Sequence, residues 1–516
     1  MIHRDREDLH HMRALRDPSI DISHAPDPTS EYSSADLHQF NDQYPLNPQL
    51  AWPRGGDELI KGVMASLSAL SELLSSETTR PVSESSDPNT MRTELGLSLS
   101  AEPQSLEEVI EHLTQVMRAA PLTSGPRFFN QLFGGRDPAA FCGELFAALG
   151  NHSVYTYKVA GPLVLIEDVL IQTLGRYAGL SAPDQPCGGI FTPGGSLSNL
   201  AAMLCARDRC APEWRERGMI DARVYTSAEA HYSVRKGAGI IGLGRDNVIA
   251  VECDEAGRLS PQALQARITA DREAGHRPML VVATAGTTVR GAFDPIDALA
   301  DVCEREDLWL HVDGAFGGSA LLTPTLRGLL RGIERADSLT WDAHKAMGVP
   351  LTCSVLLTRD SKACARSLSE SASYLFQADD DWLNPGTRSL QCGRRNDALK
   401  LWAAWRYHGD LGWARRVERA RALALDLAEQ VESREHFKLC ESPHFLNVCF
   451  EYVDSHGTPR DHQKICRLLQ VERRALVGYA TFKGRVVVRA AVINPELTSA
   501  DLTTLLDEIE TVAPRA

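Results

Sequence analysis

One lysine in the chain has the sequence surroundings of a covalent catalyst. Two short apolar runs, residues 338–341 and 351–357, are typical of neighbouring buried strands, and Lys345 lies between them. Burial disfavours the charged ammonium, so such a lysine can supply the neutral amine that condenses with an aldehyde to form a Schiff base. The alternative is a solvated lysine in a strand connection.

A second candidate feature is a glycine-rich turn that opens a helix. The apolar run 188–191 is followed by Gly194 and Gly195 and then by Ser196, Leu197 and Ser198. Small residues, hydroxyls and free amides at the positive end of a helix can bind a phosphate. The same residues could form a plain turn with a serine N-cap.

Three further apolar runs end in residues that could contribute to chemistry. His231 comes shortly after the run 222–226, where an imidazole could stack on a flat ring or could be an ordinary loop histidine. The turn containing Thr288 follows the run 279–283 and could be only a turn. Asp313 comes directly after Val312 and could pair with a pyridinium nitrogen or cap the following turn.

Taken together, these residues predict a cofactor site. A phosphate cup, a ring stacker, an acid and a lysine, in this order along the chain, are what a protein needs to hold pyridoxal phosphate. Each residue is ambiguous alone, but the combination is specific.

The elements that must position these residues form an α/β pattern. Short apolar strands alternate with amphipathic helices, which predicts a mainly parallel sheet of seven strands. In such a sheet ligands bind beyond the carboxyl ends of the strands, where the candidate residues lie. The predicted strands are residues 188–191, 222–226, 248–251, 279–283, 308–312, 338–341 and 351–357.

Composition narrows the class of protein. The chain has 516 residues, is 43% hydrophobic and carries a net charge of -14, which argues against nucleic-acid binding and against attraction to anionic membranes. It has no apolar run of 18 or more residues and no apolar leader at its start, so we expect a cytoplasmic protein without membrane contact. The twelve cysteines show no zinc-type spacing, so reduced thiols and no metal site are predicted.

Four segments follow from the patterns along the chain. Residues 1–33 are polar and without periodicity, which predicts a disordered tail, and residues 34–120 carry helical periodicity. We expect a large cofactor-binding domain over residues 121–396 and a small α+β domain over residues 397–516.

Seven blocks of the sequence resemble the pyridoxal-phosphate-dependent group II amino-acid decarboxylases of the glutamate, cysteine-sulfinate and aspartate branch. The resemblance implies a large domain of aspartate-aminotransferase type (fold type I), a smaller C-terminal domain, and a homodimer with active sites at the interface. The blocks are residues 126–135 (PRFFNQLFGG), 226–233 (TSAEAHYS), 283–296 (ATAGTTVRGAFDPI), 308–318 (LWLHVDGAFGG), 342–354 (DAHKAMGVPLTCS), 373–377 (SYLFQ) and 391–397 (QCGRRND).

The resemblance also implies roles for individual residues in binding pyridoxal 5'-phosphate. Lys345 would form the Schiff base with the cofactor, Asp313 would keep the ring nitrogen protonated, and His231 would stack on the ring. The remaining cofactor residues would hold the phosphate or line the ring: Ser196, Leu197, Ser198, His344, Thr288 and Ala315.

Three residues are the candidates for binding a substrate. Asn130 and Gln131 lie in the block that, in members acting on acidic substrates, brings an amide to the substrate's distal acid group. Arg489 lies within an apolar strand, where a guanidinium needs an anion. It either binds the side-chain acid group of a substrate or forms an internal ion pair.

Three positions depart from the family pattern, and one of them is Lys158, which stands where the family usually has glutamate. Trp382 stands where the family has a tyrosine thought to protonate the substrate carbon after carbon dioxide leaves, so His344, Lys345 or water would take over that task. Asp342 stands where many relatives have asparagine, and it would repel a phosphate unless a neighbour offsets its charge.

The predicted activity is α-decarboxylation of a small acidic L-amino acid, such as aspartate, glutamate or cysteine sulfinate. Because of Trp382, the alternative is a pyridoxal enzyme of another reaction class, an oxidative deaminase, aldehyde synthase or transaminase. A cofactor-binding scaffold without turnover is a third possibility, which the presence of both Lys345 and Asp313 disfavours.

Overall fold

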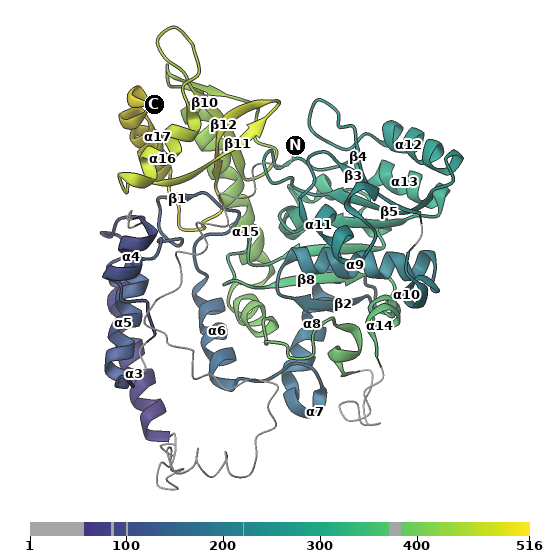
Figure 1. Ribbon diagram of the computed structural model, residues 1–516, viewed down its shortest axis with the longest axis horizontal. Helices are drawn as coiled ribbons and strands as arrows, with labels where there is room; N and C mark the ends of the chain where they lie inside the picture. Colours follow the sequence, from purple (N-terminus) through teal and green to yellow (C-terminus); the bar gives the residue numbers. More distant parts are fainter. Residues whose placement is uncertain (1–55, 84–86, 100–101, 220, 371–382) are drawn as a thin grey trace, which may run out of the picture. The chain divides into compact units, whose positions relative to one another are not determined.

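The computed structural model describes residues 56–83, 87–99, 102–219, 221–370 and 383–516 (Figure 1). The predicted tail over residues 1–33 and the departure at Trp382 lie outside these ranges. None of the helices within them has an apolar stretch long enough to cross a lipid bilayer.

The larger sheet has seven strands, and all of its neighbouring strands are parallel except β8, which is antiparallel to both β2 and β7. This confirms the mainly parallel α/β sheet that the sequence predicts, including the pairing of the strands on either side of Lys345. Across the sheet the order is β2 (Gly188–Thr192), β8 (Ser354–Thr358), β7 (Ser338–Asp342), β6 (Trp309–Asp313), β5 (Arg277–Thr284), β3 (Ala222–Ser227) and β4 (Val248–Val251).

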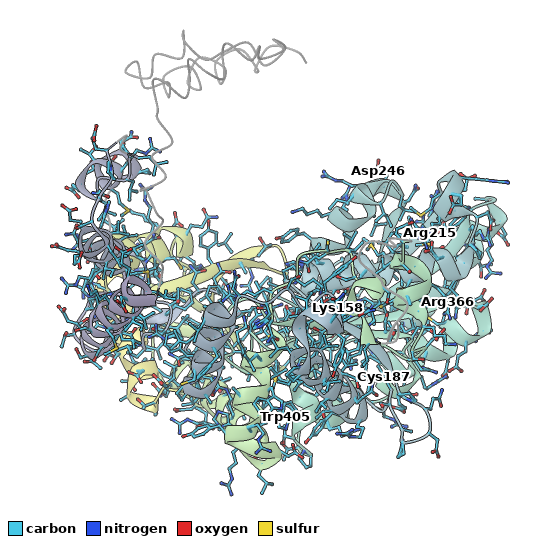
Figure 2. The ribbon with its side chains drawn as sticks, turned by 90° about the horizontal axis from the view of Figure 1, so that it is seen from below. Lys158, Cys187, Arg215, Asp246, Arg366 and Trp405 are labelled. Carbon is cyan, nitrogen blue, oxygen red and sulfur yellow. The ribbon has the colours of Figure 1, made fainter. Side chains whose placement is uncertain are left out.

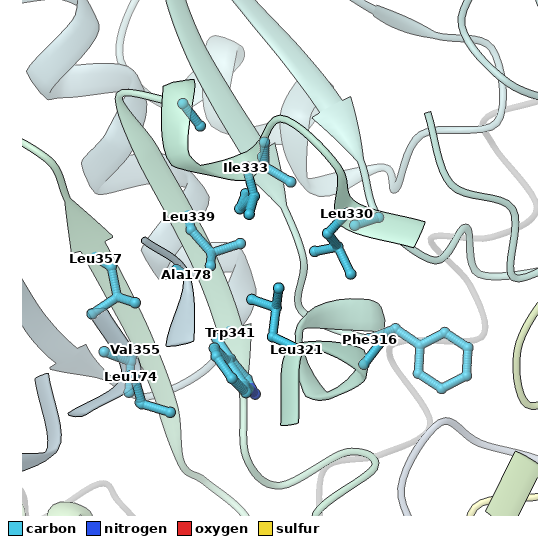
Figure 3. Close-up of a cluster of buried hydrophobic side chains, with 14 of the residues drawn as sticks. Leu174, Ala178, Phe316, Leu321, Leu330, Ile333, Leu339, Trp341, Val355 and Leu357 are labelled. Carbon is cyan, nitrogen blue, oxygen red and sulfur yellow. The ribbon is translucent and has the colours of Figure 1, made fainter. Parts of the chain in front are cut away.

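Helices cover both faces of this sheet, which is why most of its strands read as continuous apolar runs. One apolar core joins the sheet to α8 (Pro162–Tyr177), α12 (Pro261–Glu273) and α13 (Ile296–Glu306). Figure 3 shows part of this core around Trp341, with Leu339, Val355 and Leu174 beside it. A second core on the other face is formed with α9 (Gly195–Cys210), α11 (Ser233–Ile240) and α14 (Ala363–Leu368).

The smaller sheet has five strands in the order β1 (Phe128–Phe129), β11 (Leu476–Phe482), β12 (Arg485–Ala491), β10 (Asn447–Tyr452) and β9 (Phe437–Leu439). β1 is parallel to β11, and the other neighbouring pairs are antiparallel. Its core is formed with α16 (His462–Val471), α17 (Ser499–Val512) and the end of α15 (Ala398–Glu432).

The first half of α15 packs against the core of the larger sheet instead. Its Trp405, labelled in Figure 2, has its ring centroid 5.9 Å from that of Tyr177 and 5.9 Å from that of Trp413.

Some elements differ from those that the sequence predicts. The strand expected over residues 351–357 begins only at Ser354, because residues 351–353 form a loop. β11 was not predicted, and β1 joins the smaller sheet although it comes from within the range 121–396. The long helix α15 changes direction at Gly409, whose φ of 60° is left-handed.

The N-terminal segment is helical where it is described. It contains α3 (Gly56–Ser75), α4 (Pro88–Glu94) and α5 (Leu106–Ala119). Asp87 starts α4 by accepting hydrogen bonds from the amides of Asn89 and Thr90. By its contacts the chain divides into two compact units, one made of residues 1–69 with 105–110 and the other of the remaining chain. Both sheets belong to the second unit.

Candidate active site

A cavity of about 320 Å³ lies at the carboxyl edge of the larger sheet. Most of its wall residues end β5, β6 or β7 or follow β2, β3, β5, β6 or β7 within a few positions, as expected for a parallel sheet. The structure therefore brings together most of the cofactor residues that the sequence predicts: Ser196, Leu197, His231, Thr288, Asp313, Ala315, His344 and Lys345.

Asp313 ends β6 as a nearly buried carboxylate with two hydrogen-bond donors. Its Oδ2 accepts a hydrogen bond from Asn199 Nδ2 at 2.7 Å, and its Oδ1 accepts one from the Ala315 amide at 3.1 Å. Both oxygens retain a lone pair, so the group can also receive a proton-bearing nitrogen in the cavity.

Lys345 lies in the turn after β7, and its side chain is 22% exposed, so it is less buried than the sequence suggests. Its Nζ lies 3.5 Å from Asp342 Oδ2. Asp342 is buried, and His344 Nε2 lies 3.5 Å from the same oxygen. The amine of Lys345 is therefore placed to offset the negative charge that would repel a phosphate.

The two histidines of the cavity are held differently. His344 is buried, and its Nδ1 lies 3.0 Å from the carbonyl oxygen and 3.2 Å from the amide nitrogen of Cys353. His231 is half-buried, and its Nδ1 lies 3.3 Å from the Ser233 amide that donates to it. Burial lowers the pKa of both imidazoles below the ordinary value, which favours neutral rings that can pack against an apolar surface.

The turn before α9 forms the end of the cavity that could bind an anion. A Cβ at Gly195 would lie 2.8 Å from Asp342 Oδ2, so only glycine lets the chain pass here. The Leu197 amide donates to the Gly194 carbonyl at 2.9 Å. Ser198 does not line the cavity, and its hydroxyl lies within hydrogen-bond distance of Thr192 Oγ1 and Ser354 Oγ. Of the predicted phosphate residues, Ser196 and Leu197 thus reach the cavity, whereas Ser198 lies behind it.

The predicted substrate residues line a different hollow, of about 960 Å³, at the smaller sheet. Asn130 and Gln131 contact each other there, with Gln131 Nε2 donating to Asn130 Oδ1 at 3.0 Å. Arg489 of β12 is buried, and its Nε and Nη1 have no hydrogen-bond partner among the described residues. The described ranges contain no ion pair to Arg489 either, so they do not support the internal pair. Burial lowers the pKa of this guanidinium.

The two hollows are joined through short segments of chain. Leu132 lines the cavity of Lys345 and follows directly after Gln131, which lines the hollow of Arg489. Asn447 at the start of β10 donates to the carbonyl of Thr288 at 2.9 Å. The strand next to Arg489 is thus attached to a turn of the cofactor cavity.

The residues of the larger cavity fit pyridoxal phosphate. The glycine turn and Ser196 offer amides and a hydroxyl for the phosphate, His231 and Ala315 offer surfaces for the ring, and Asp313 offers an anion for its nitrogen. The buried Asp342 Oδ1 has no hydrogen-bond partner among the described residues, which leaves one acceptor at this cavity for a hydrogen-bond donor of a ligand.

The sequence interpretation did not single out several residues of this cavity. Asn199 lines it and contacts Asp313, and Leu351 and Thr352 form part of its wall. The available signals were weak: Asn199 belongs to the glycine-rich helix opening, and Leu351 reads as part of a strand.

Comparison with known proteins identifies a matching protein family and several relatives of this chain. The family model described as "Pyridoxal-dependent decarboxylase conserved domain" matches residues 88–453. The chain is 42% identical to cysteine sulfinic acid decarboxylase of Homo sapiens over 449 residues, which cover 83% of this chain and 90% of that protein. It is 37% identical to the acidic amino acid decarboxylase GADL1 of Bos taurus over 485 residues, covering 90% and 92% of the two chains.

A solved structure gives the same result for the fold. The crystal structure of mouse CSAD in its apo form superposes with a TM-score of 0.84 at 37% identity, covering 88% of this chain and 99% of that chain.

Proposed function

This chain belongs to the pyridoxal-dependent decarboxylases, and from that premise we propose that it removes carbon dioxide from the α-carbon of a small acidic L-amino acid. Aspartate, glutamate and cysteine sulfinate are the candidate substrates. The relatives are named for decarboxylation of acidic amino acids, which supports this reaction over an oxidative deaminase, aldehyde synthase or transaminase.

Pyridoxal phosphate supplies an electron sink for the electron pair that remains when a carboxylate leaves. In our proposal Lys345 holds the cofactor through its amine, and Asp313 holds a proton at the ring nitrogen. His231 packs on the face of the ring, with Ala315 and Thr288 also lining it. Ser196 and the amides of the helix opening bind the phosphate, supported by His344.

The substrate specificity that we propose depends on Arg489. A guanidinium that is buried without a partner among the described residues is costly for the fold, because charge is removed from water without compensation. A bound carboxylate or sulfinate would compensate it through charge-assisted hydrogen bonds. Asn130 and Gln131, beside it in the same hollow, would add amide donors. This unpartnered charge is the observation that carries the proposal.

Gripping the side-chain acid group also directs the reaction. A substrate held at its far end by Arg489 and at its amine in the cavity has little freedom to rotate, so the protein decides which bond at the α-carbon stands perpendicular to the ring. Once carbon dioxide has left, a proton must return to that carbon. We propose that Lys345 or His344 carries it, since both side chains line the cavity.

The experiment is a product analysis of the purified holoenzyme with aspartate, glutamate and cysteine sulfinate. Carbon dioxide and the corresponding amine should form in equal amounts from at least one of them. Peroxide and ammonia without amine would overturn the proposal in favour of an oxidative deaminase. Lys345→Ala should form no amine and no yellow complex with the cofactor, whereas Lys362→Ala, at an exposed lysine, should behave as the unmodified enzyme.

We further propose that the enzyme is a homodimer with active sites at the interface. Exposed apolar side chains gather on α6 (Pro138–Gly150), where Phe146 is 67% and Leu149 68% exposed. A second stripe on α3 repeats at helical spacing through Ile60, Met64 and Leu67. Contiguous exposed apolar surface of this kind is typical of subunit contacts.

A cytoplasmic location also belongs to the proposal. All twelve cysteines of the chain lie in the described ranges and are free thiols. Proteins of oxidising compartments usually pair such residues as disulfides.

A further inference from the structure

Behind Asp313 the larger sheet contains a chain of buried polar side chains, and apart from Asp313 itself its members have no role in the function proposed above. It runs from β6 and β7 to α9 and consists of Trp309, Ser338, His311, Asn199 and Asp313. His311 and Asn199 are 1% and 2% exposed. Polar groups buried this deeply are costly unless each hydrogen bond is made, so their arrangement is informative.

The direction of the first hydrogen bonds follows from chemistry. Trp309 Nε1 lies 2.8 Å from Ser338 Oγ, and an indole nitrogen can only donate. At the other end of the chain the Asp313 carboxylate can only accept, so Asn199 turns Nδ2 to it and Oδ1 to His311, whose Nε2 must carry a proton. Ser338 Oγ can then donate its own proton to His311 Nδ1, at 2.8 Å. Burial lowers the pKa of His311 to about 4, so the ring is neutral and its one proton lies on Nε2.

The same logic fixes the orientation of the Asn199 amide. His311 Nε2 donates to Asn199 Oδ1 at 3.0 Å, and Thr340 Oγ1 donates to the same oxygen at 2.8 Å. An amide whose oxygen receives two donors must turn its NH₂ group to the other side. There Nδ2 donates to Asp313 Oδ2 at 2.7 Å and to Ser233 Oγ at 3.1 Å.

We propose that Asn199 and His311 are positioning residues that hold the Asp313 carboxylate toward the cavity and thereby help to hold the proton on the ring nitrogen of pyridoxal phosphate. Hydrogen bonds to a carboxylate favour its charged form, and His311 prevents the amide from rotating its oxygen toward that charge. The proposal rests on the position of Asp313 at the ring nitrogen, which belongs to the proposed function.

A purely structural network predicts something different. If these groups only satisfied one another in the core, their replacement would lower the stability of the fold and leave the protonation of the ring unchanged. The protonation state of the bound cofactor therefore separates the two interpretations, and it is measured without turnover.

The experiment uses holoenzyme reconstituted with pyridoxal phosphate labelled with nitrogen-15 at the ring nitrogen, whose NMR shift reports protonation. We compare His311→Leu, which removes the donor, with His311→Gln, whose side-chain amide can donate in place of Nε2. His311→Leu should lower the proton affinity of the ring nitrogen about tenfold or more, and His311→Gln should restore most of it.

Thr340→Val is the second variant, because valine keeps the shape of threonine and removes one of the two donors to Asn199. It should lower the affinity severalfold, and it decides the question if His311→Leu fails to fold. His462→Leu is the matched control, since His462 is also buried and hydrogen-bonded but lies in the smaller sheet's core region. It should leave the ring nitrogen unchanged.

Asp313→Asn separates this proposal from the site assignment on which it rests. If Asp313→Asn leaves the ring nitrogen protonated, the placement of Asp313 is wrong. If Asp313→Asn lowers its proton affinity while His311→Leu and Thr340→Val leave it at the unmodified value, the placement stands and the positioning proposal is overturned.

Discussion

Arg489 places a positive charge inside the smaller sheet at the expense of stability. On β12 it lies opposite Cys449 of β10 and Gly478 of β11, neither of which can neutralise it. Desolvation without a partner is unfavourable, so the unliganded protein carries a cost that an acidic substrate would relieve.

We therefore predict opposite effects of Arg489→Met on stability and on function. The free energy of unfolding of the substrate-free protein should rise by about 1–3 kcal/mol, because a buried unpaired charge is replaced by an apolar chain. The kcat/KM for acidic amino acids should fall by roughly ten- to hundredfold through loss of a charge-assisted contact. Urea unfolding and steady-state kinetics measure the two quantities.

Arg485→Met is the control for this prediction. Arg485 begins the same strand, is exposed, and pairs with Glu451. Its replacement should leave substrate use unchanged. Equal losses for acidic and apolar amino acids in Arg489→Met would refute the assignment of Arg489 to the side-chain acid group.

The buried His311 predicts a dependence of stability on pH. Its pKa is lowered to about 4 in the folded protein, mainly by burial, against an ordinary value of 6.5. Between these two values the unfolded chain binds a proton that the folded protein excludes, so stability falls as the pH falls through this window. The group contributes up to about 3 kcal/mol to this loss.

The variant His311→Gln isolates that contribution, because glutamine does not titrate. The difference in unfolding free energy between the apo forms of the unmodified protein and of His311→Gln should shift by up to about 3 kcal/mol in favour of the variant from pH 7 to pH 4. The buried Asp294 acts in the opposite direction, since its pKa is raised to about 6, but it is common to both proteins. A difference that is constant with pH would contradict the neutral state of His311.

At the scale of elements, the wall of the cavity depends on α15. Lys400 of this helix is fully buried, and its Nζ donates to the carbonyls of Thr352 at 2.7 Å and Pro350 at 3.2 Å. It also pairs with Asp397 at 2.8 Å and Glu144 at 3.2 Å. One ammonium thus connects a long helix to the loop that includes Thr352 in the cavity.

We predict that Lys400→Met destabilises the protein strongly. It leaves two carbonyls and two partly buried carboxylates without their cation, which should lower the free energy of unfolding by about 3–5 kcal/mol. Cofactor affinity should fall as well, because Thr352 loses its support. Urea unfolding of the apoprotein and cofactor titration measure these effects. Lys438→Met, at an exposed lysine, should change stability by no more than about 0.5 kcal/mol.

The way in which an element is buried decides whether the sequence predicts it. The strands of the larger sheet are readable as apolar runs because helices cover both faces. The expected start of β8 was wrong because Leu351 is apolar for another reason: it lines the cavity instead of continuing the strand. β11 contains Gly478, where a Cβ would lie 3.3 Å from the Asn130 carbonyl, and such close contacts are invisible in a linear pattern.

The residues of the candidate site likewise divide into those that the sequence predicts and those that it does not. Lys345, Asp313 and His231 could be predicted because each follows a readable strand and carries reactive chemistry. Asn199 and His311 could not, since their roles depend on hydrogen bonds between α9, β6 and β7 that only the folded sheet brings together. For His311 the available signal was a histidine in the middle of an otherwise apolar strand.

At the scale of the whole compact unit, the two sheets are held together next to the cavity. Asn447 donates to the carbonyls of Thr288 and Val289, and Arg290 Nε donates to Glu441 at 2.7 Å. These contacts connect the strands around Arg489 to the turn that includes Thr288. These part-buried hydrogen bonds thereby fix the distance between the hollow of Arg489 and the cavity of Lys345.

The exposed surface of this unit also predicts that two copies of the chain assemble. Phe146 and Leu149 lie one turn apart on α6 and expose most of their apolar surface, which a second copy of the chain would cover. Replacing both by aspartate puts two charges into that contact, so the double variant should sediment as a monomer under conditions in which we expect the unmodified enzyme to sediment as a dimer. Ala148→Asp, also exposed on the same helix, places one charge beside the patch without removing apolar area and should remain largely dimeric.

Because we place the active sites at the interface, the double variant should also lose activity in proportion to its dissociation, with activity returning at high protein concentration. An unmodified enzyme that sediments as a monomer at all concentrations and still turns over its substrate would refute the shared site.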